Sequence, residues 1–271
     1  MKKSYTTVLT IAGSDSSGGA GIQADIKTFA ALECFGLSVI TAITAQNSTG
    51  VNAIYPVGEK CIRDQFWSIS GDISIDAVKI GMLGSAAAIK TVSALLRELK
   101  GNPHVILDTV LASTGGTALL PADAIPILKE DLFPLASLIT PNLPECALLT
   151  GMKYAPVTPE AIEECASKLL ETGTASVLVK GGHGEGEECR DCLLYDNRFI
   201  WFTSKKIMTG NTHGTGCTLS SAIAAFMARG ETTDRAVEKA KVYIDEALQA
   251  GDAYIFGHGH GPLHHFYRFW Q

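Results

Sequence analysis

Short apolar runs alternate along the chain with longer segments in which apolar residues recur at helical spacing. Strands are predicted over residues 6–11, 37–44, 77–80, 105–107, 135–139 and 176–179. Helices are predicted over residues 18–34, 59–70, 86–100, 121–132, 159–172, 214–228 and 234–249. Strands that are followed by helices in this way are typical of parallel βαβ units. The pattern therefore predicts an α/β fold with a mostly parallel central sheet.

Two further runs, 192–195 and 199–203, flank the turn 196–198 and predict an antiparallel hairpin at one edge of that sheet. The run 37–44 is apolar without alternation, which is typical of a strand that is buried on both faces. No linker, repeat or low-complexity tract divides the chain. We therefore expect a single domain that covers residues 1–271.

The most informative segment is the glycine-spaced turn 211–217, which leads directly into the apolar helix predicted over 214–228. Unpaired backbone N–H groups and the positive end of the helix dipole meet at such a turn, so it is suited to hold an anion. Cys217 lies just inside the turn, and the same field is expected to lower the pKa of its thiol. An anion site with an ionisable group at its centre favours phosphoryl transfer over phosphate binding alone.

Composition narrows the class of protein. The chain is 46% hydrophobic and 18% charged, which is ordinary for a globular protein, and its net charge of −6 argues against binding to nucleic acid or anionic membranes. The apolar run 8–12 is too short for a signal peptide or a membrane span. Seven scattered cysteines suit reduced thiols, and the pair Cys189 and Cys192 is interpreted as flanking a hairpin strand. We expect a cytoplasmic protein.

Polar residues or glycines follow the C-terminal end of nearly every predicted strand. They are Gly13-Ser14-Asp15, Gln46-Asn47, Gly81-Met82, Asp108, Asn142 with Glu145, and Lys180-Gly181-Gly182. Ligands of open parallel sheets bind outside the carboxyl ends of the strands, although polar loops are also common where there is no site. Together with the anion turn, these loops predict one crevice at that end of the sheet.

The first of these loops, residues 13–21, is rich in glycine but matches neither a Walker A motif nor a dinucleotide-binding fingerprint. It is either a flexible strand–helix turn or a floor that lets a flat ligand approach the backbone closely. Asp25 lies one turn into the next predicted helix. Its carboxylate either complements the helix dipole or faces a pocket and accepts hydrogen bonds from a ligand.

Three charged residues at strand ends suit phosphate chemistry. Asp108 and Glu145 each follow a buried strand and offer the hard oxygen ligands that Mg²⁺ prefers, although each could also be a turn or cap acid. Lys180 ends a buried strand and precedes two glycines, so we expect it to meet nucleotide phosphates rather than only solvent. These residues predict ATP and Mg²⁺ as ligands.

Eight spaced motifs, in order along nearly the whole chain, resemble those of one kinase family. They cover residues 12–25, 45–48, 79–83, 107–110, 140–145, 180–183 (KGGH), 213–217 (HGTGC) and 261–266. The family is the hydroxymethylpyrimidine kinase/phosphomethylpyrimidine kinase family of thiamine biosynthesis, which belongs to the ribokinase-like kinases. The resemblance implies a three-layer α/β/α fold and two ATP-dependent phosphorylations. The first acts on the hydroxymethyl group of 4-amino-5-hydroxymethyl-2-methylpyrimidine, and the second converts the monophosphate to the pyrophosphate.

Carried over position by position, the resemblance implies roles for three groups of residues. The pyrimidine would be surrounded by Gly13, Asp25, Gln46, Met82, Val110 and Cys217. The anion hole would be formed by Gly214, Thr215, Gly216 and Cys217. ATP would be bound by Asn142, Glu145, Lys180 and Gly182. The metal would be held by Asp108 and Glu145. Sugar kinases of the wider superfamily carry aspartate at the position of Cys217, which suggests a thiolate as the proton acceptor of the first step.

Two features stand apart from the resemblance. Many relatives carry a lysine in the loop after residues 107–110, where this chain has Thr114 and its neighbours. The C-terminal histidines, His258, His260, His264 and His265, are interpreted as loop residues rather than metal ligands. Pyridoxal or pyridoxine kinase activity and a non-catalytic pyrimidine or nucleotide sensor stay open as alternatives. Dimers occur among such kinases, so a homodimer is a further expectation.

Overall fold

The computed structural model describes residues 3–113, 116–182 and 187–270. Its strands are Thr7–Asp15 (β1), Phe35–Asn47 (β2), Gly50–Pro56 (β3), Ala77–Ile80 (β4), His104–Leu107 (β5), Leu138–Ile139 (β6), Val177–Val179 (β7), Glu188–Tyr195 (β8) and Arg198–Lys205 (β9). Its α-helices are Gly21–Ala31 (α1), Glu59–Ser70 (α2), Ala86–Glu98 (α3), Ile125–Asp131 (α4), Leu143–Thr150 (α5), Pro159–Leu170 (α6), Thr215–Ala228 (α7) and Thr233–Gly251 (α8). Two short 3₁₀ turns, Ala122–Ala124 and Phe133–Leu135, flank α4.

The described strands form one sheet in the order β3-β2-β1-β4-β5-β6-β7-β8-β9. The neighbours from β2 to β7 are parallel. At the two edges, β3 pairs antiparallel with β2, and β8 and β9 continue antiparallel from β7. The predicted α/β fold with a mostly parallel sheet and an antiparallel hairpin at one edge is confirmed.

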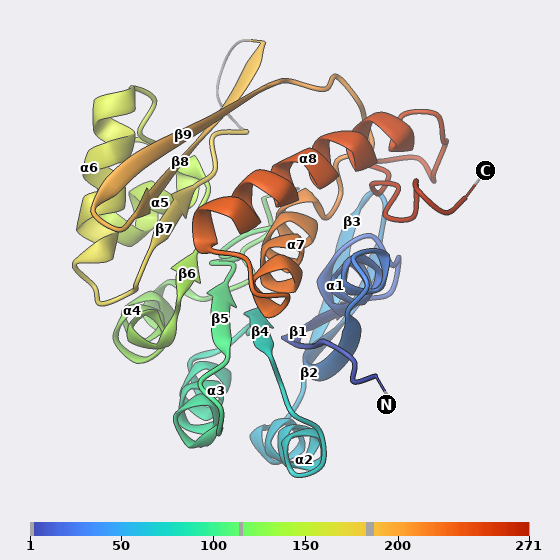
Figure 1. Ribbon diagram of the computed structural model, residues 1–271, viewed down its shortest axis with the longest axis vertical. Coiled ribbons are helices and arrows are strands. Elements are labelled where there is room, and N and C mark those ends of the chain that lie inside the picture. Colours follow the sequence, from blue (N-terminus) through green and yellow to red (C-terminus); the bar gives the residue numbers. More distant parts are fainter. Residues whose placement is uncertain (1–2, 114–115, 183–186, 271) are drawn as a thin grey trace.

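Helices cover both faces of the sheet and give three layers (Figure 1). Helices α1, α7 and α8 pack on one face, where Phe29 is fully buried. Helices α2 to α6 pack on the other face, where Phe66 is fully buried. Neighbouring residues of β4 alternate between the two layers, with Ala77 in the first and Val78 in the second, as the period of two in a strand requires.

The hairpin of β8 and β9 closes on Asp196 and Asn197, which have φ values of 51° and 55°. Two consecutive left-handed residues are the requirement of a type I′ turn, whose twist matches that of the flanking strands. Asparagine and aspartate tolerate this conformation better than other non-glycine residues. The local sequence is therefore sufficient to explain why the chain reverses here.

One prediction about the sheet is wrong. The run 37–44 lies within the longer strand β2, and the end of that strand is not buried on both faces. Ile43 is 52% exposed, and it lies opposite the exposed Tyr55 of β3. An edge strand that the apolar pattern did not predict, β3, pairs with this end of β2, and pairing within a sheet satisfies the backbone without covering the side-chain faces.

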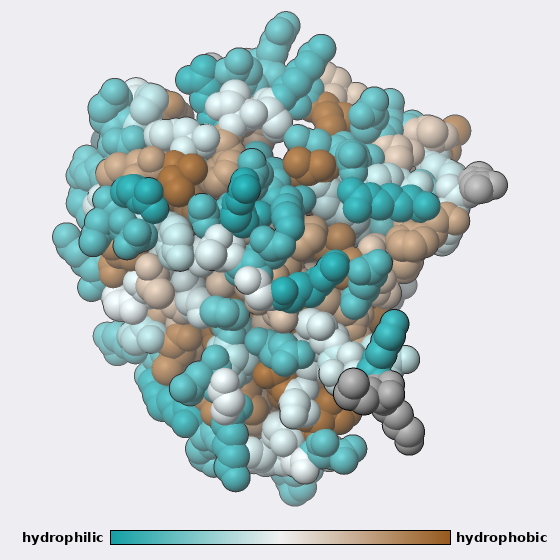
Figure 2. Space-filling view, in the orientation of Figure 1, coloured by the Kyte–Doolittle hydropathy of each residue, from teal (hydrophilic) through white to brown (hydrophobic). Residues whose placement is uncertain are grey.

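Helix α1 begins at Gly21 rather than at residue 18, and α5 is a helix that the apolar spacing did not predict. Figure 2 shows that one broad face of the molecule is mostly hydrophilic, with small and separate apolar patches. No helix within the described ranges is both long enough and apolar enough to cross a membrane.

Candidate active site

The strand order places a topological switch between β1 and β4. From β1 the chain runs to β2 on one side, and it later returns to β4 on the other side. The carboxyl ends of such a strand pair are the usual ligand site of open parallel sheets. Gly13 lies in an irregularity near the end of β1, and Met82 follows β4. A Cβ atom at Gly13 would lie 3.4 Å from Met82 Sδ, so these two predicted substrate residues line the same spot.

The turn 211–217 lies at the N-terminus of α7, as the sequence predicted. Gly214 has φ 83°, and a Cβ atom there would overlap the carbonyl oxygen of Gly19, so both conformation and space require glycine. Among the described residues, no side chain caps this helix. The amides of Gly216 and Cys217 in the first turn have no intrahelical acceptor, which is the arrangement that holds an anion.

Lys180 and Asp108 meet at this helix end. Lys180 Nζ lies 2.8 Å from Asp108 Oδ1, and a Cβ atom at Gly216 would lie 3.4 Å from Lys180 Nζ and 3.5 Å from Asp108 Oδ2. Thr140 and Ser220 donate to the same carboxylate at 3.0 and 3.3 Å. Burial alone would raise the pKa of Asp108, but Lys180 holds that pKa below its usual range. An ionised pair therefore stands beside the anion turn.

Glu145 and Asn142 form a capping box at the start of α5. Asn142 Oδ1 accepts from the Glu145 N–H, and Glu145 Oε2 accepts from the Asn142 N–H, each at 2.9 Å. Glu145 also accepts from Thr109 Oγ1 at 2.9 Å and from the Leu111 N–H at 3.2 Å. Its carboxylate thus fixes the chain on both sides of the half-buried Val110. Glu145 positions the loop after β5, a role that its prediction as a ligand did not include.

Asp15 and His213 link the glycine-rich loop to the anion turn. Asp15 accepts from the N–H groups of Ser17, Gly19 and Ala20 at 2.8, 3.1 and 2.8 Å, and lies 2.8 Å from His213 Nε2. Burial alone would raise the pKa of Asp15, but the bonds to His213 and Ser17 lower it to about 2. Because a carboxylate can only accept, His213 Nε2 carries the proton.

Neither Asp15 nor His213 was predicted as an individual site residue, although both lie in segments predicted to belong to the site. An aspartate two residues before a serine in a glycine-rich turn is typical of an Asx turn, and this spacing was the available signal for Asp15. No comparable local signal exists for His213, because its partner lies 198 residues away in the chain.

Gln46 lies near the end of β2, beside His213. Its Nε2 is 3.3 Å from His213 Nε2, and its Oε1 accepts from Thr44 Oγ1 at 3.2 Å. Since His213 gives its Nε2 proton to Asp15, the contact with Gln46 is not a second hydrogen bond. The half-buried Gln46 side chain therefore keeps its amide hydrogens for a ligand.

A hollow of about 280 Å³ lies beside Met82. Its lining residues are Ala42, Ile54, Pro56, Leu83, Gly84, Ala118, Leu119 and Pro121. Met82 does not line the hollow itself, but it lies next to the lining residue Gly84, where a Cβ atom would be 3.7 Å from Met82 Cε. The hollow thus adjoins the predicted pyrimidine side of the crevice.

Asp25 lies in a buried ion pair. Its carboxylate is fully buried and pairs through both oxygens with Lys79 Nζ, at 2.8 and 2.9 Å. Thr10 and Ser221 donate to the same carboxylate at 2.6 and 2.7 Å. Lys79, Thr10 and Ser221 thus occupy the Asp25 carboxylate in this structure, and its contact with the ring stays a prediction. Burial alone would lower the pKa of Lys79, but Asp25, together with Cys217 and Asp108, raises it.

Cys217 corrects a second prediction. The helix field was expected to lower the pKa of its thiol, whereas burial raises that pKa from 9.0 to about 11. The nearby ammonium group of Lys79 opposes this rise, but the carboxylates of Asp25 and Asp108 add to it. Desolvation is the largest influence on this pKa, and it disfavours the charged thiolate. Cys217 is therefore a thiol at neutral pH.

The donor set near Lys180 suits a magnesium ion that keeps most of its waters. Asp108 Oδ1 is occupied by Lys180 and Thr140, but Asp108 Oδ2 accepts only the 3.3 Å bond from Ser220, whereas Glu145 uses both oxygens for the backbone and Thr109. No group of three or more histidine, cysteine, aspartate or glutamate side chains is arranged for a metal within the described part of the chain. The residues fit Mg²⁺ with Asp108 as the main protein ligand.

The remaining predicted residues lie at the rim of the site or outside it. Gly182 is exposed and follows Lys180, and Thr114 lies outside the described residues. His265 is buried, with its Nε2 3.0 Å from Thr218 Oγ1 in α7, and His264 packs against the rings of Tyr254 and Trp270.

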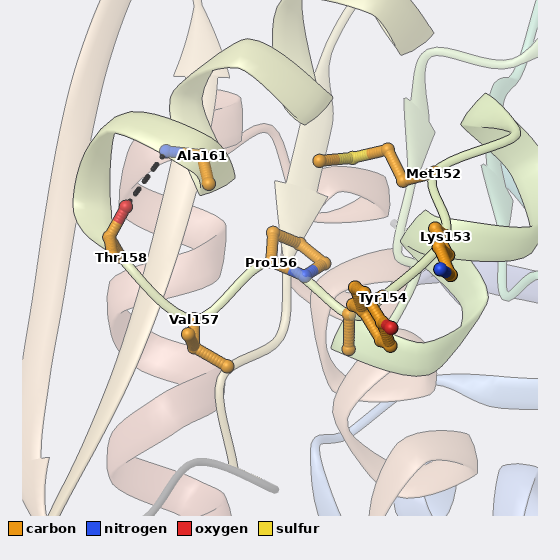
Figure 3. Close-up of a pocket in the computed structure, with 8 residues that line it drawn as sticks. Met152, Lys153, Tyr154, Pro156, Val157, Thr158 and Ala161 are labelled. Carbon is orange, nitrogen blue, oxygen red and sulfur yellow. Dashed lines mark hydrogen bonds between the residues drawn. The ribbon is translucent and has the colours of Figure 1, made fainter.

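A larger hollow, of about 360 Å³, lies between the end of α5 and the start of α6 (Figure 3). Figure 3 shows Met152, Tyr154 and Val157 around it, and Thr158 Oγ1 accepting from the Ala161 N–H at 3.3 Å to cap α6. It contains none of the predicted site residues. The candidate active site is instead the N-terminus of α7, where Lys180, Asp108 and Gly216 meet.

Comparison with known proteins confirms the family resemblance that the sequence motifs indicated. Residues 15–264 match the family described as phosphomethylpyrimidine kinase. A protein of Rhizobium meliloti named hydroxymethylpyrimidine/phosphomethylpyrimidine kinase is 45% identical over 97% of this chain and 98% of its own length.

Two solved structures are also similar. A phosphomethylpyrimidine kinase from Clostridium difficile is 42% identical, with a TM-score of 0.78 over 89% of this chain and 99% of its own. An ADP complex of Bacillus subtilis pyridoxal kinase is 35% identical, with a TM-score of 0.88 over 97% of this chain and 98% of its own. The chain belongs to the phosphomethylpyrimidine kinase family.

Proposed function

We propose that this protein is an ATP-dependent kinase of thiamine biosynthesis. It phosphorylates 4-amino-5-hydroxymethyl-2-methylpyrimidine and then the monophosphate, which gives the pyrophosphate. The observation that carries the proposal is the meeting of Lys180, Asp108 and Gly216 at the N-terminus of α7. An ammonium group, a carboxylate and unpaired helix amides at one point are what phosphoryl transfer requires. Membership of the family supports the choice of substrates.

The phosphate side of the site is built from α7 and the loop after β7. Lys180 meets the phosphates as a point charge, and the amides of Gly214, Thr215, Gly216 and Cys217 surround the transferred group. Asn142 and Gly182 contact the nucleotide. A bound Mg²⁺ would neutralise the β- and γ-phosphate oxygens, with Asp108 as its protein ligand and Glu145 behind it.

The pyrimidine side is built from the ends of β1, β2 and β4. Gly13 gives the flat ring room to approach the backbone, and Met82 packs on its face. Gln46 donates its free amide hydrogens to a ring nitrogen, and Val110 closes the opposite side. The hollow of about 280 Å³ beside Met82 supports this placement.

In the first reaction, the hydroxyl oxygen of the pyrimidine forms a bond to the γ-phosphorus. The bond from that phosphorus to the β–γ bridging oxygen breaks, and ADP leaves. The transition state of such transfers is loose and needs little help from a base, so the hydroxyl proton can pass to a phosphoryl oxygen or to water. A protonated Cys217 is compatible with this chemistry, since its backbone amide supplies the stabilisation. In the second reaction, the acceptor is already an anion.

The test is to incubate the purified protein with ATP, Mg²⁺ and the hydroxymethylpyrimidine, and to follow the products by mass. The proposal predicts the monophosphate first and the pyrophosphate later. Pyridoxal and pyridoxine form a second arm, because a similar structure at 35% identity is a pyridoxal kinase. Preference for pyridoxine would establish that alternative, and unphosphorylated products throughout would leave only a non-catalytic sensor.

We also propose that the protein acts in the cytoplasm, since none of its seven cysteines forms a disulfide within the described residues. Homodimer formation stays a prediction that a measurement of molar mass in solution would test.

A further inference from the structure

A buried ion pair lies behind the loop that carries Lys180, on the side away from the reacting atoms. Asp191 of β8 is 2% exposed, and Lys241 of α8 is 8% exposed. Lys241 Nζ lies 2.5 Å from Asp191 Oδ2. Burial alone would lower the pKa of Lys241, but Asp191 keeps it raised, so the ammonium group stays charged.

The other oxygen of Asp191 holds the backbone next to Lys180. Asp191 Oδ1 accepts from the Gly181 N–H at 2.7 Å. On the preceding residue, the Lys180 N–H donates to the carbonyl oxygen of Pro141 at 2.8 Å. Two consecutive amides are thus held by partners on different elements, which fixes the direction in which the Lys180 side chain leaves the chain.

The neighbouring strand β8 leaves the Gly181 backbone no room to move. A Cβ atom at Gly181 would overlap the carbonyl oxygen of Arg190 in β8, so the loop is pressed against the strand that carries Asp191. On its far side, Lys180 Nζ lies 2.8 Å from Asp108 Oδ1 and would lie 3.4 Å from a Cβ atom at Gly216. A shift of the Gly181 backbone would therefore move Lys180 Nζ relative to the anion turn.

Stability alone does not explain this pair. Replacing a buried ion pair by apolar residues of similar size is often neutral or stabilising, because desolvation offsets most of the attraction. A hydrogen bond from a backbone N–H to an ionised carboxylate, in contrast, is short and fixes a direction. The negative charge of Asp191 strengthens the hydrogen bond that it accepts from the Gly181 N–H. The ammonium group of Lys241 compensates that charge in the interior.

We infer that Asp191 is a positioning residue for Lys180, with Lys241 as its counter-ion. The inference rests on the proposed function, because it assumes that Lys180 meets the phosphates of ATP. Asp191 lies outside the crevice. Its loss should raise the KM for ATP and change the KM for the pyrimidine little.

The test compares two double variants, both of which lack the buried charges. Asp191→Asn with Lys241→Met keeps an amide oxygen that can accept from Gly181, whereas Asp191→Ala with Lys241→Met does not. We expect the KM for ATP, and the dissociation constant for ADP with Mg²⁺, to be about tenfold higher in the alanine variant than in the asparagine variant. The KM for the pyrimidine should differ less than about twofold between them.

Equal KM values for ATP in the two folded variants, or equal rises for both substrates, would overturn the inference. Thermal melting establishes that each variant is folded. If the alanine variant does not fold, amide exchange in the uniformly ¹⁵N-labelled wild-type protein decides. The Gly181 amide should exchange as slowly as the amides of β7, and fast exchange would overturn the inference. A wild-type protein that transfers no phosphate would instead refute the proposed function, while the exchange result would still stand.

Discussion

Lys79 and Asp25 form an ion pair in which neither side chain reaches solvent. The two charges come from β4 and α1, and Thr10 and Ser221 complete the carboxylate's hydrogen bonds from β1 and α7. Four elements that meet beneath the crevice are therefore joined at one carboxylate. Each charge of the pair compensates the other, so loss of one partner leaves a buried charge without a counter-ion.

Lys79→Met should lower the free energy of unfolding by about 3–5 kcal/mol, and Lys79→Met with Asp25→Asn should restore most of that loss, because no buried charge remains. Urea denaturation measures both. The exposed pair of Lys60 and Asp64 provides the control, and Lys60→Met should change stability by less than about 0.5 kcal/mol. A Lys79→Met protein as stable as the wild type would contradict the burial of this pair.

Cys217 should react as a protonated thiol. Burial raises its pKa to about 11, so the fraction of thiolate is small at neutral pH and grows about tenfold for each pH unit up to that value. We expect the rate of alkylation by iodoacetamide, followed by peptide mass analysis, to rise without a plateau from pH 7 to pH 10. The exposed Cys61 is the internal reference for reagent access. A plateau near neutral pH would show the activated thiolate that the sequence predicted.

A protonated Cys217 also changes what its removal should do. If the thiol only shapes the site, Cys217→Ala should reduce the first and the second phosphorylation by similar factors, within about tenfold of each other. A proton acceptor would act on the first reaction alone, where general base catalysis is worth on the order of 10²–10⁴ in rate. Separate kcat values for the two acceptors distinguish these cases, and a selective loss of the first reaction would restore the base role.

Stability should fall in mild acid because of His265. Burial lowers the pKa of this side chain from 6.5 to about 3, so the unfolded chain binds a proton at pH values where the folded protein does not. Its contribution is complete above pH 6.5 and declines as the pH falls towards 3, by about 3 kcal/mol between pH 6.5 and pH 4. Denaturation at several pH values should show a shallower decline for His265→Gln than for the wild type. An identical decline of stability with pH in the two proteins would show that His265 is not the cause of the acid sensitivity.

Local patterns were enough to predict some features of the fold and site. Helix α2 and strand β4 have the bounds that apolar spacing gave, and the turn before α7 was recognised from its glycines alone. Strand β3 was missed because Gly50–Pro56 contains glycine, asparagine and proline, which disfavour a strand until β2 pairs with it.

Other features depend on contacts that the sequence does not display. Lys79 meets Asp25 across 54 residues, and nothing near either residue indicates the partner. The pKa of Cys217 was predicted in the wrong direction because the helix field is a local effect, whereas desolvation depends on how the whole site packs. The hydrogen bond from the Gly181 N–H to Asp191 could not be predicted either, because it too depends on how the chain packs.

The most direct test of the central claim is the steady-state kinetics of Gly216→Ala. A Cβ atom there would lie 3.4 Å from Lys180 Nζ and 3.5 Å from Asp108 Oδ2, which the fold tolerates as ordinary contact, and alanine favours a helix more than glycine does. The variant should therefore melt no lower than the wild type, yet kcat for both phosphorylations should fall by about 100-fold, because the methyl group occupies the place of the transferred phosphoryl group. Gly58→Ala, where no atom lies within 4 Å of the added Cβ, is the matched control. A folded Gly216→Ala protein with wild-type rates would contradict the assignment of this helix end as the centre of the active site.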